Sequence, residues 1–316
     1  MIIPAYNEEK MIGKSLVEIL KLDYNNLEIL VCLDGCTDGT ERVVNDTINK
    51  YKTTDKRVLI LKNKERLGKA ATIMKLLKTA TGEIIVLNDA DWKFLANKEE
   101  FDKLIRCFDD PKVGGVHIGT TLGFLENAEN ASKLKSTLYL GNAWACIFIT
   151  KYQIERFTKR INGKLYVDKD KMGFPFEIDI FRKELIGDIH TTCDDSEFSY
   201  QILRKGYEVQ VVIEEGYPRF EDMNRILTFK DVIKTKIRGE AGRKLLTKEF
   251  NANFVTFYFK ISMYMLFNIF RVKTSRAKIG LLAWIYLTII SVVASKLLIR
   301  RSRSTRVMWS MKVRRE

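Results

Sequence analysis

The chain has 316 residues, of which 46% are hydrophobic and 30% charged, so it can bury a substantial core and is neither disordered nor purely membrane-embedded. Five cysteines, with Cys32 and Cys36 the only close pair, fit a reducing compartment better than a disulfide scaffold or a zinc site. Residues 271–316 hold 12 Lys and Arg and one acid, and carry most of the net charge of +14. These basic residues flank an apolar run, so a membrane surface is a better partner than nucleic acid.

Strands and helices alternate through the first part of the chain. We expect strands at 1–3, 28–33, 57–61 and 83–87, and helices at 8–20, 40–51 and 69–80. The first strand is short against the usual five or six residues, which favours a strand that begins a few residues before Met1. Repeated units of this length imply an α/β fold, a mainly parallel sheet with helices on both faces.

The remaining sequence predicts a strand at 113–118, helices at 126–160 and 195–205, a strand at 206–213 and a basic helix at 228–249. We therefore expect an α/β domain over 1–215 and a basic amphipathic helical segment over 216–250. Membrane-associated or transmembrane helices over 251–299 and a basic tail over 300–316 would complete the chain.

Acidic side chains follow the predicted strands or open a later helix. In an open parallel sheet, ligands bind beyond the carboxyl ends of the strands. The acids at these points are Glu8, Asp34, Asp89, Asp91, Asp194 and Asp195. Carboxylates placed together repel one another unless a positive group lies between them. Asp89 and Asp91 flank Ala90, and such hard oxygen ligands favour Mg²⁺ or Mn²⁺, which often binds phosphate oxygens as well. This pattern predicts a diphosphate substrate.

Each motif also has a purely structural interpretation. Asp34-Gly35 can form a simple turn, and Asp194-Asp195 can stabilise a helix N-terminus. The ordered combination, with each member placed after a strand or at the start of a helix, favours a functional site.

Five segments together resemble the inverting family 2 glycosyltransferases of the GT-A fold over about residues 1–215. These segments are Ile2-Ile3-Pro4-Ala5-Tyr6-Asn7-Glu8-Glu9, Leu33-Asp34-Gly35, Arg66-Leu67-Gly68-Lys69, Asn88-Asp89-Ala90-Asp91 and Cys193-Asp194-Asp195. The chain departs from the family pattern where Leu33 replaces an acid, Cys193 replaces Thr and Asp194 replaces Glu.

The resemblance implies a role for each matched residue. The donor-binding residues would be Pro4, Ala5, Tyr6, Glu8, Asp34, Lys69, Asp89, Ala90 and Asp91, with Asp34 contacting the base. Asp91 and Asp89 would hold Mg²⁺ or Mn²⁺, with Asp91 the more direct ligand. Asp195 would be the general base and Asp194 its neighbour. Lys236 and Arg238, on the basic helix, would reach the diphosphate, although this helix lacks the Gln-x-x-Arg-Trp motif of polysaccharide synthases.

The expected function is metal-dependent, inverting transfer of a sugar from a nucleotide-sugar donor to a lipid-linked or saccharide acceptor. A processive polysaccharide synthase is the alternative among enzymes. An inactive homologue that acts as a binding or scaffold subunit is the alternative from another class.

Two apolar runs, 254–270 and 279–295, predict contact with the cell membrane, with the catalytic domain in the cytoplasm. Three arrangements are open: both runs span, only the second spans, or both lie in the interface or re-enter. Each spanning arrangement places a basic cluster outside, whereas the third keeps every basic cluster on the cytoplasmic side. We expect at least one span; helices buried in a soluble domain are the alternative.

Overall fold

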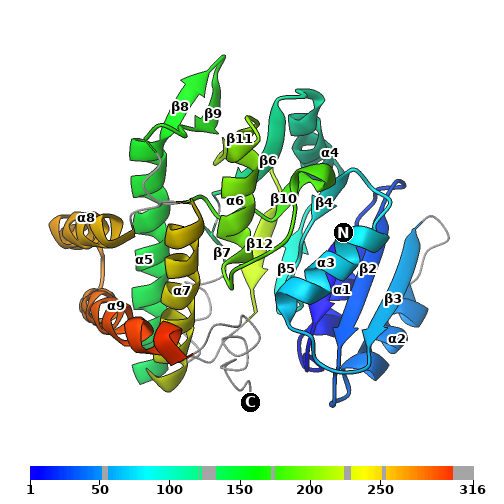
Figure 1. Ribbon diagram of the computed structural model, residues 1–316, viewed down its shortest axis with the longest axis horizontal. Coiled ribbons are helices and arrows are strands. Elements are labelled where there is room, and N and C mark those ends of the chain that lie inside the picture. Colours follow the sequence, from blue (N-terminus) through cyan, green and yellow to red (C-terminus); the bar gives the residue numbers. More distant parts are fainter. Residues whose placement is uncertain are drawn as a thin grey trace.

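The computed structural model describes residues 1–51, 56–119, 121–122, 133–171, 175–223, 229–250 and 254–301. Two regions lie side by side in Figure 1: strands flanked by helices, formed mainly by the first half of the chain, and a group of long helices. The strands of the described residues form three sheets.

The first sheet confirms the predicted alternation of strands and helices. It is parallel and consists of β1 (Ile2–Ala5), β2 (Glu28–Asp34) and β3 (Arg57–Asn63), in that order. A parallel bridge between Ile2 and Leu87 connects it to the second sheet. β1 and β2 therefore run in the same direction as the segment that ends at Leu87. The loops that follow β1, β2 and Leu87 accordingly lie at the same edge of the sheets.

The second sheet corrects the prediction of a mainly parallel arrangement. Its six strands, in spatial order, are β4 (Ile84–Val86), β10 (Ile180–Arg182), β6 (Val113–Ile118), β11 (Glu208–Val212), β9 (Lys164–Val167) and β8 (Thr158–Ile161). Only β6 and β11 pair in parallel; β10 runs antiparallel to both of its neighbours. The sheet is mixed because β10 enters between β4 and β6 from the opposite direction.

The β8–β9 hairpin replaces the end of the helix predicted at 126–160. Asn162 and Gly163 form its turn, with φ of 48° and 81°. Both residues adopt the left-handed conformation, which Asn-Gly pairs favour in two-residue hairpins. A small third sheet contains β5 (Trp92–Leu95), β12 (Arg219–Asp222) and β7 (Thr121–Leu122).

Helices cover both faces of the strands, as predicted. Side chains of β2 alternate: Ile29 and Val31 pack in one apolar cluster with α1 (Ile12–Lys21) and α2 (Thr40–Tyr51). Leu30 and Cys32 pack in another with α3 (Lys69–Thr79) and α6 (Asp194–Arg204). This period of two, with apolar residues at every position, is typical of a strand buried on both faces. A further helix, α4 (Lys98–Ile105), begins at a capping box formed by Asn97 and Glu100.

Four long helices form the second region in Figure 1: α5 (Lys133–Phe157), α7 (Phe229–Phe250), α8 (Phe254–Phe267) and α9 (Ser275–Arg301). Their shared apolar core also includes Cys193 and Tyr200 from the start and middle of α6. The basic helix predicted at 228–249 is confirmed as α7. The tail at 302–316 and the predicted helical residues 126–132 lie outside the described residues.

The predicted membrane span at 279–295 is not supported by the structure. In the described parts of the chain, no helix has the combined length and apolarity needed to cross a bilayer. The run lies inside α9, where Thr288 and Ser291 are buried against protein and Lys278 lies near the first turn. The other run forms α8, whose 14 residues extend about 21 Å, short of the roughly 30 Å hydrocarbon core.

We expect Gly280→Val to destabilise the helical region by at least about 1–3 kcal/mol, because α5 and α9 meet there backbone to backbone. A Cβ at Gly280 would lie 2.1 Å from the Thr137 carbonyl oxygen, and one at Gly141 would lie 2.2 Å from the Gly280 carbonyl carbon. Urea unfolding measures the loss. Gly82→Ala is the control, because its Cβ would meet only Ile84 O at 3.7 Å; equal losses in both variants would contradict the close crossing.

Candidate active site

The loop after β1 is fixed by contacts with the loop after β2. Asn7 adopts φ of 54° and exchanges two hydrogen bonds with Thr37: Thr37 N donates to Asn7 Oδ1 at 2.8 Å, and Asn7 Nδ2 donates to Thr37 Oγ1 at 3.1 Å. Glu8 is buried, and its backbone N–H donates to Thr40 Oγ1 at 2.7 Å. Pro4 is half-buried and Ala5 is buried at the end of β1. The Tyr6 ring lies 4.1 Å from the Arg66 guanidinium, which forms an aromatic and cationic surface suited to a base.

Asp34 holds the loop that leads into α3. Its two carboxylate oxygens accept hydrogen bonds from the backbone N–H groups of Leu67 and Gly68, each at 2.8 Å. Asn63 Nδ2 donates to the same carboxylate at 2.9 Å. The next residue, Gly35, has φ of 64°, and a Cβ there would lie 2.4 Å from Arg66 N. In this structure Asp34 therefore positions the Arg66–Lys69 segment, and its predicted contact with a base stays a prediction.

Lys69 joins two carboxylates that are distant in the sequence. Its Nζ lies 2.9 Å from Asp89 Oδ1 and Oδ2 and 3.0 Å from Asp194 Oδ2. Burial alone would lower the pKa of Lys69, but Asp194 and Asp89 more than offset this and hold that pKa well above its usual value. The amine therefore stays charged and connects the carboxyl end of β4 to the start of α6.

The Asp-x-Asp segment lies in a turn after β4. Asp89 is partly exposed at its side chain, whereas Ala90 and Asp91 are buried. Loss of water raises the pKa of Asp89, Lys69 opposes the shift, and Asp91 and Asp194 add to it. The backbone carbonyl of Asp91 accepts from Met223 N at 3.1 Å, which ties the turn to the end of β12. The structure thus brings Asp89 and Asp91 together with Asp194, as the sequence predicts.

Asp195 lies on the first turn of α6 and is partly accessible to solvent. Desolvation and the nearby Glu177 raise its pKa to about 6, although Lys69, the Ser196 backbone N–H and Arg243 oppose the shift. Desolvation, opposed by Lys69, likewise raises the pKa of Asp194, and Asp195 adds to the increase. A carboxylate with a pKa near 6 is suited to accept a proton at neutral pH.

Buried Glu197 fixes the loop before these two acids. Its carboxylate accepts from the backbone N–H groups of His190, at 2.9 and 3.1 Å, and of Thr191, at 2.9 Å. In the sequence, Glu197 is not distinguished from the other acids at the start of α6, so its role was not predicted.

Asp179 is a further site residue that the sequence analysis missed. It directly precedes β10, and its backbone carbonyl accepts from Leu87 N at 2.7 Å. Desolvation and the charges of Asp195 and Asp89 hold its pKa well above the usual value. The sequence does contain a pattern typical of a strand here: buried Phe176, Ile178 and Ile180 alternate with Glu177 and Asp179.

Helix α7 packs on the loop that carries the acids of α6. A Cβ at Gly242 would lie 2.5 Å from Thr192 Oγ1 and 2.7 Å from Cys193 Sγ, so the helix backbone needs a glycine there. Cys193 Sγ also donates to Gly239 O at 3.5 Å. Arg243, on the same turn of α7, forms an ion pair with Glu240 at 3.2 Å. Its charge opposes the increase in the pKa of Asp195.

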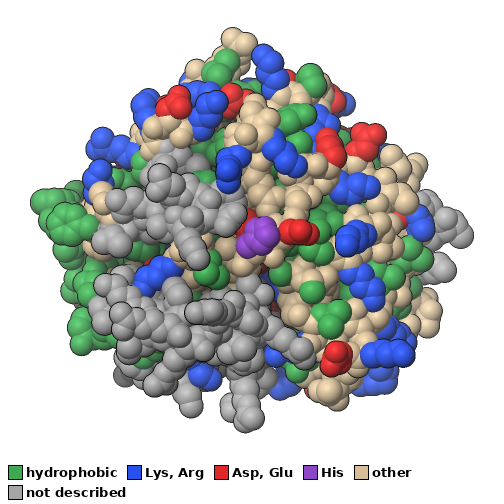
Figure 2. Space-filling model, viewed as in Figure 1, with side chains coloured by type: hydrophobic (Ala, Val, Ile, Leu, Met, Phe, Trp, Pro, Cys, Tyr) green, Lys and Arg blue, Asp and Glu red, His purple; other side chains and the backbone are tan. Residues whose placement is uncertain are grey.

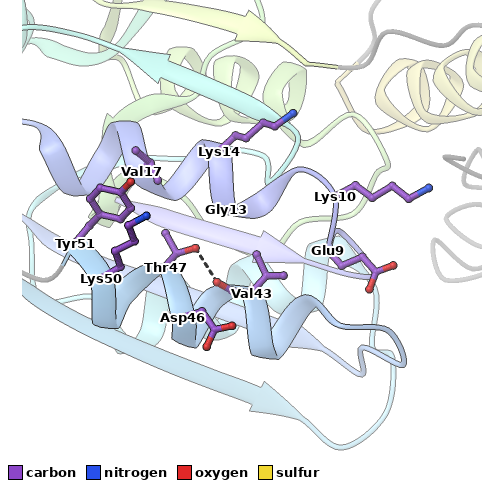
Figure 3. Close-up of a pocket in the computed structure, with 10 residues that line it drawn as sticks. All are labelled: Glu9, Lys10, Gly13, Lys14, Val17, Val43, Asp46, Thr47, Lys50 and Tyr51. Atoms are coloured by element: carbon purple, nitrogen blue, oxygen red, sulfur yellow. Dashed lines mark hydrogen bonds between the residues drawn. The ribbon is translucent and has the colours of Figure 1, made fainter.

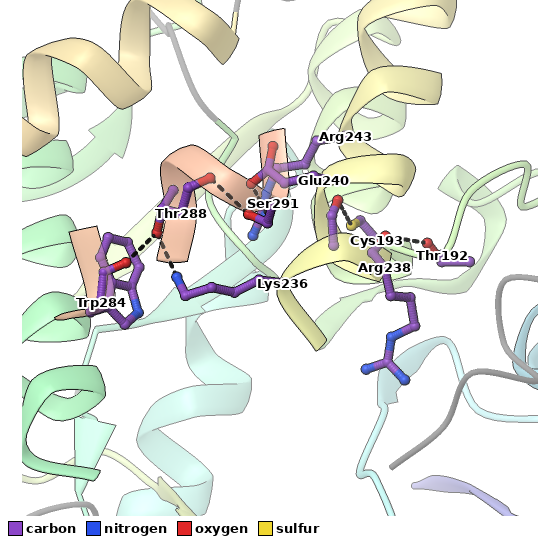
Figure 4. A network of polar contacts seen from close by, with 10 residues as sticks. Thr192, Cys193, Lys236, Arg238, Glu240, Arg243, Trp284, Thr288 and Ser291 are labelled. Atoms are coloured by element: carbon purple, nitrogen blue, oxygen red, sulfur yellow. Dashed lines mark hydrogen bonds and ion pairs between the residues drawn. The ribbon is translucent and has the colours of Figure 1, made fainter. Parts of the chain in front are cut away.

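The structure directs the two predicted cations of α7 to different places. Lys236 points toward α9: its Nζ donates to Thr288 Oγ1 at 2.6 Å and lies 3.4 Å from the centre of the Trp284 ring. Burial lowers the pKa of Lys236 to about 7, with Arg243 adding to the shift and Glu240 opposing it. Arg238 points the other way in Figure 4. Lys236 therefore makes its contacts inside the helical region, away from the Lys69 cluster, and a role for Arg238 at a diphosphate stays a prediction.

The acidic cluster of Asp89, Asp91 and Asp194 supplies only some of the ligands that a divalent cation needs. No three His, Cys, Asp or Glu side chains are arranged as a metal site in the portion of the chain that the structure describes. Asp194 is buried with its Oδ2 3.0 Å from the Lys69 amine, so this single amine faces the carboxylates of both Asp89 and Asp194. The cluster can thus accept further positive charge, and Asp89 and Asp91 can supply two oxygen ligands. The remaining ligands would have to come from a substrate or water.

A groove of about 380 Å³ lies between α1 and α2 (Figure 3). Lys14 and Lys50 are among its lining residues, but the acids described above are not.

The α/β fold places several acids at one edge, and comparison with known proteins supplies the family. The model of the family described as "Glycosyl transferase family 2" matches residues 1–185. The chain therefore belongs to glycosyl transferase family 2 and is an enzyme of the glycosyltransferase class, which confirms the resemblance.

Curated relatives match over part of their length. The chain is 36% identical over 100 residues to the Escherichia coli UDP-Glc:alpha-D-GlcNAc-diphosphoundecaprenol beta-1,3-glucosyltransferase WfgD, covering 32% of this chain and 37% of that protein. It is 28% identical over 149 residues to the Trichomonas vaginalis dolichyl-phosphate beta-glucosyltransferase ALG5C, covering 44% of this chain and 43% of that protein. The matches thus span about two fifths of the length of these relatives.

A solved structure extends the likeness in fold to nearly the whole chain. It is the mannosyltransferase PcManGT from Pyrobaculum calidifontis in complex with GDP-Man and Mn²⁺, at 21% identity and a TM-score of 0.50. The alignment covers 98% of this chain and 82% of that one. The match supports the GT-A type of fold.

Proposed function

We propose that this enzyme transfers a sugar, with inversion and with the help of a divalent cation, from a nucleotide-diphosphate sugar to a lipid-linked or saccharide acceptor. The observation that carries the proposal is the Lys69-centred cluster, in which Asp89 and Asp194 lie within 3.0 Å of one amine and Asp195 follows on the same helix turn. The donor-side acids and the acid able to act as a base therefore lie at one edge of the fold.

The transfer step needs a proton acceptor. Asp195 takes the proton from an acceptor hydroxyl as that oxygen attacks the anomeric carbon of the donor sugar. The bond between the anomeric carbon and the diphosphate oxygen breaks at the same time, and the nucleoside diphosphate leaves. Attack opposite to the leaving group inverts the configuration, and a single carboxylate base is sufficient for it.

The donor side supplies recognition and charge. Tyr6 and Arg66 offer a stacking surface for the base, and Asp34 holds the loop that carries Arg66. Asp91 and Asp89 would hold the divalent cation, which supplies positive charge to the leaving diphosphate. Lys69 keeps Asp89 and Asp194 at the required spacing before the donor binds.

The names of the relatives support the type of acceptor. WfgD is named for an acceptor linked to diphosphoundecaprenol, and ALG5C for dolichyl phosphate. Both acceptors carry a long lipid, so we propose that the acceptor of this enzyme is lipid-linked and presented at a membrane.

Donor binding is testable by thermal unfolding. We expect UDP or GDP with Mn²⁺ to stabilise the protein, and a nucleotide at about 100 times its dissociation constant to add ~2.7 kcal/mol. Asp91→Asn should abolish the part of the shift that requires Mn²⁺, because Asp91 would be the more direct ligand. The measurement is the midpoint of unfolding with each nucleotide, with and without Mn²⁺.

The control is Asp46→Asn, which removes an acid of α2 that is paired only with exposed Arg42 among the ion pairs of the described residues. This variant should keep the full shift. If neither nucleotide shifts the folded wild-type protein, the proposed activity is wrong, and a binding or scaffold role for an inactive homologue becomes the better explanation.

A further inference from the structure

Helix α8 exposes an apolar stripe on the side opposite to its packed face. Phe257, Ile261 and Met265 are buried in the helical region. The outward side carries Phe259, which is 69% exposed, and Phe267, which is 71% exposed; Phe270 follows in the next turn at 70%. Met263 and Leu266 complete the stripe. Phe259, Met263 and Phe267 are spaced four residues apart on α8, so they lie along one face of that helix.

Helix α9 carries a second stripe of the same kind. Its buried side consists of Ala277, Leu281 and Ile285. The exposed hydrophobic residues of α9 are Ile279, Leu282, Tyr286, Ile289 and Ile290. In Figure 2, hydrophobic side chains gather along the edge where Figure 1 places α8 and the neighbouring part of α9. A contiguous apolar surface of this kind on a folded protein marks an interaction site.

The segment that carries these stripes is basic throughout, and beside it Glu155 of α5 accepts a hydrogen bond from Tyr264 of α8. Residues 254–301 contain eight Lys and Arg and no Asp or Glu. Lys260 is exposed on α8, Arg271 and Lys273 are exposed between the two helices, and Arg276 is exposed in the first turn of α9. Exposed aromatic rings flanked by cations are typical of segments that lie in the interface of an anionic bilayer.

We propose that the α8–α9 surface docks on an anionic lipid bilayer, with both helices lying in the plane of the interface. Lipid tails would cover Phe259, Phe267 and Phe270, and lipid phosphates would pair with the flanking cations. A second copy of the chain fits this surface less well, because a symmetric dimer brings identical patches together and would place these cations opposite one another. Docking does not depend on the proposed transfer chemistry, because it can be measured without substrates.

The test is co-sedimentation of the full chain with vesicles of phosphatidylcholine, alone or mixed with phosphatidylglycerol. We expect binding to the mixed vesicles. A Phe259→Ser, Phe267→Ser and Phe270→Ser variant should lose at least about tenfold in partitioning, since each ring loses its burial in lipid. Lys260→Glu with Lys273→Glu should weaken binding to the anionic vesicles and leave any binding to phosphatidylcholine unchanged.

Ile161→Ser is the matched control, because Ile161 is an exposed hydrophobic residue on β8, away from the stripes. It should bind vesicles as the wild type does. All variants replace exposed side chains, and circular dichroism verifies their fold. Vesicle binding that survives both sets of substitutions overturns the proposal. So does a dimer in light scattering that dissociates in the triple Phe variant while no vesicle binding is detected.

Discussion

Asp195→Asn should reduce the turnover number by about 10²–10⁴ and leave donor binding in place. The amide has the same shape as the carboxylate but cannot accept the proton of an acceptor hydroxyl. The folded protein should be no less stable at pH 7, because the substitution removes a partly desolvated charge that lies near Glu177. Steady-state kinetics with a nucleotide sugar, together with the thermal shift by the nucleotide, separate loss of catalysis from loss of binding.

The pH profile gives an independent readout of the same group. Desolvation raises the pKa of Asp195 to about 6, so the fraction that can act as a base falls as the pH drops below that value. We expect kcat/KM of the wild type to fall about tenfold per pH unit on the acid side of this pKa. The residual activity of Asp195→Asn should lack this limb. Asp188→Asn changes an exposed acid ahead of the same helix and should leave both rate and profile unchanged; a parallel loss there would contradict the assignment.

Lys69→Met should destabilise the protein by about 3 kcal/mol at neutral pH, because it leaves Asp89 and Asp194 without their shared cation. The pKa of each acid in the folded state would then rise further above its unfolded value. The loss of stability should therefore be small below about pH 3, where the acids are protonated in both states, and grow as the pH rises through the unfolded pKa of about 3.9. Urea unfolding across this range measures it.

A double variant isolates the ion pair from the packing of the side chain. Lys69→Met with Asp194→Asn should recover part of the lost stability, because one of the two unpaired charges is gone. Lys78→Met, on an exposed position of the same helix α3, should cost little. Absence of any recovery in the double variant would show that the charges of the cluster are not coupled through Lys69.

Local sequence patterns were sufficient to predict the strands and helices of the first part of the fold and to indicate that Asp89, Asp91 and Asp194 lie near one another. A continuous apolar strand such as β2, and the acid at its end, can be recognised from a few neighbouring residues in the sequence. The mixed sheet was not predictable in the same way, because the direction of β10 is set by pairing with β4 and β6, distant in the sequence. For this reason Asp179 was missed, although it lies beside the predicted acids.

The basic helix α7 illustrates a second limit of prediction from the sequence. Its periodicity predicts α7 correctly but does not say which neighbour each face of the helix meets. Lys236 turns to Trp284 and Thr288 because α9, 50 residues later, packs against that face. The exposed apolar stripes were likewise visible as runs of hydrophobic residues, but only packing in the structure separates their buried side from their outward side.

The contact between Gly242 and the Thr192–Cys193 loop has a consequence for the order in which the enzyme becomes competent. During synthesis, Asp34, Asp89 and Asp91 leave the ribosome early, and Asp194 and Asp195 leave it before α7 does. Glu197 holds the start of the loop before those two acids, but its end at Thr192 and Cys193 gains its packing only when Gly242 of α7 is in place. A growing or truncated polypeptide that ends before this helix would already hold the donor residues yet lack an oriented base. Activity should therefore appear only after α7 has been made and has packed on this loop.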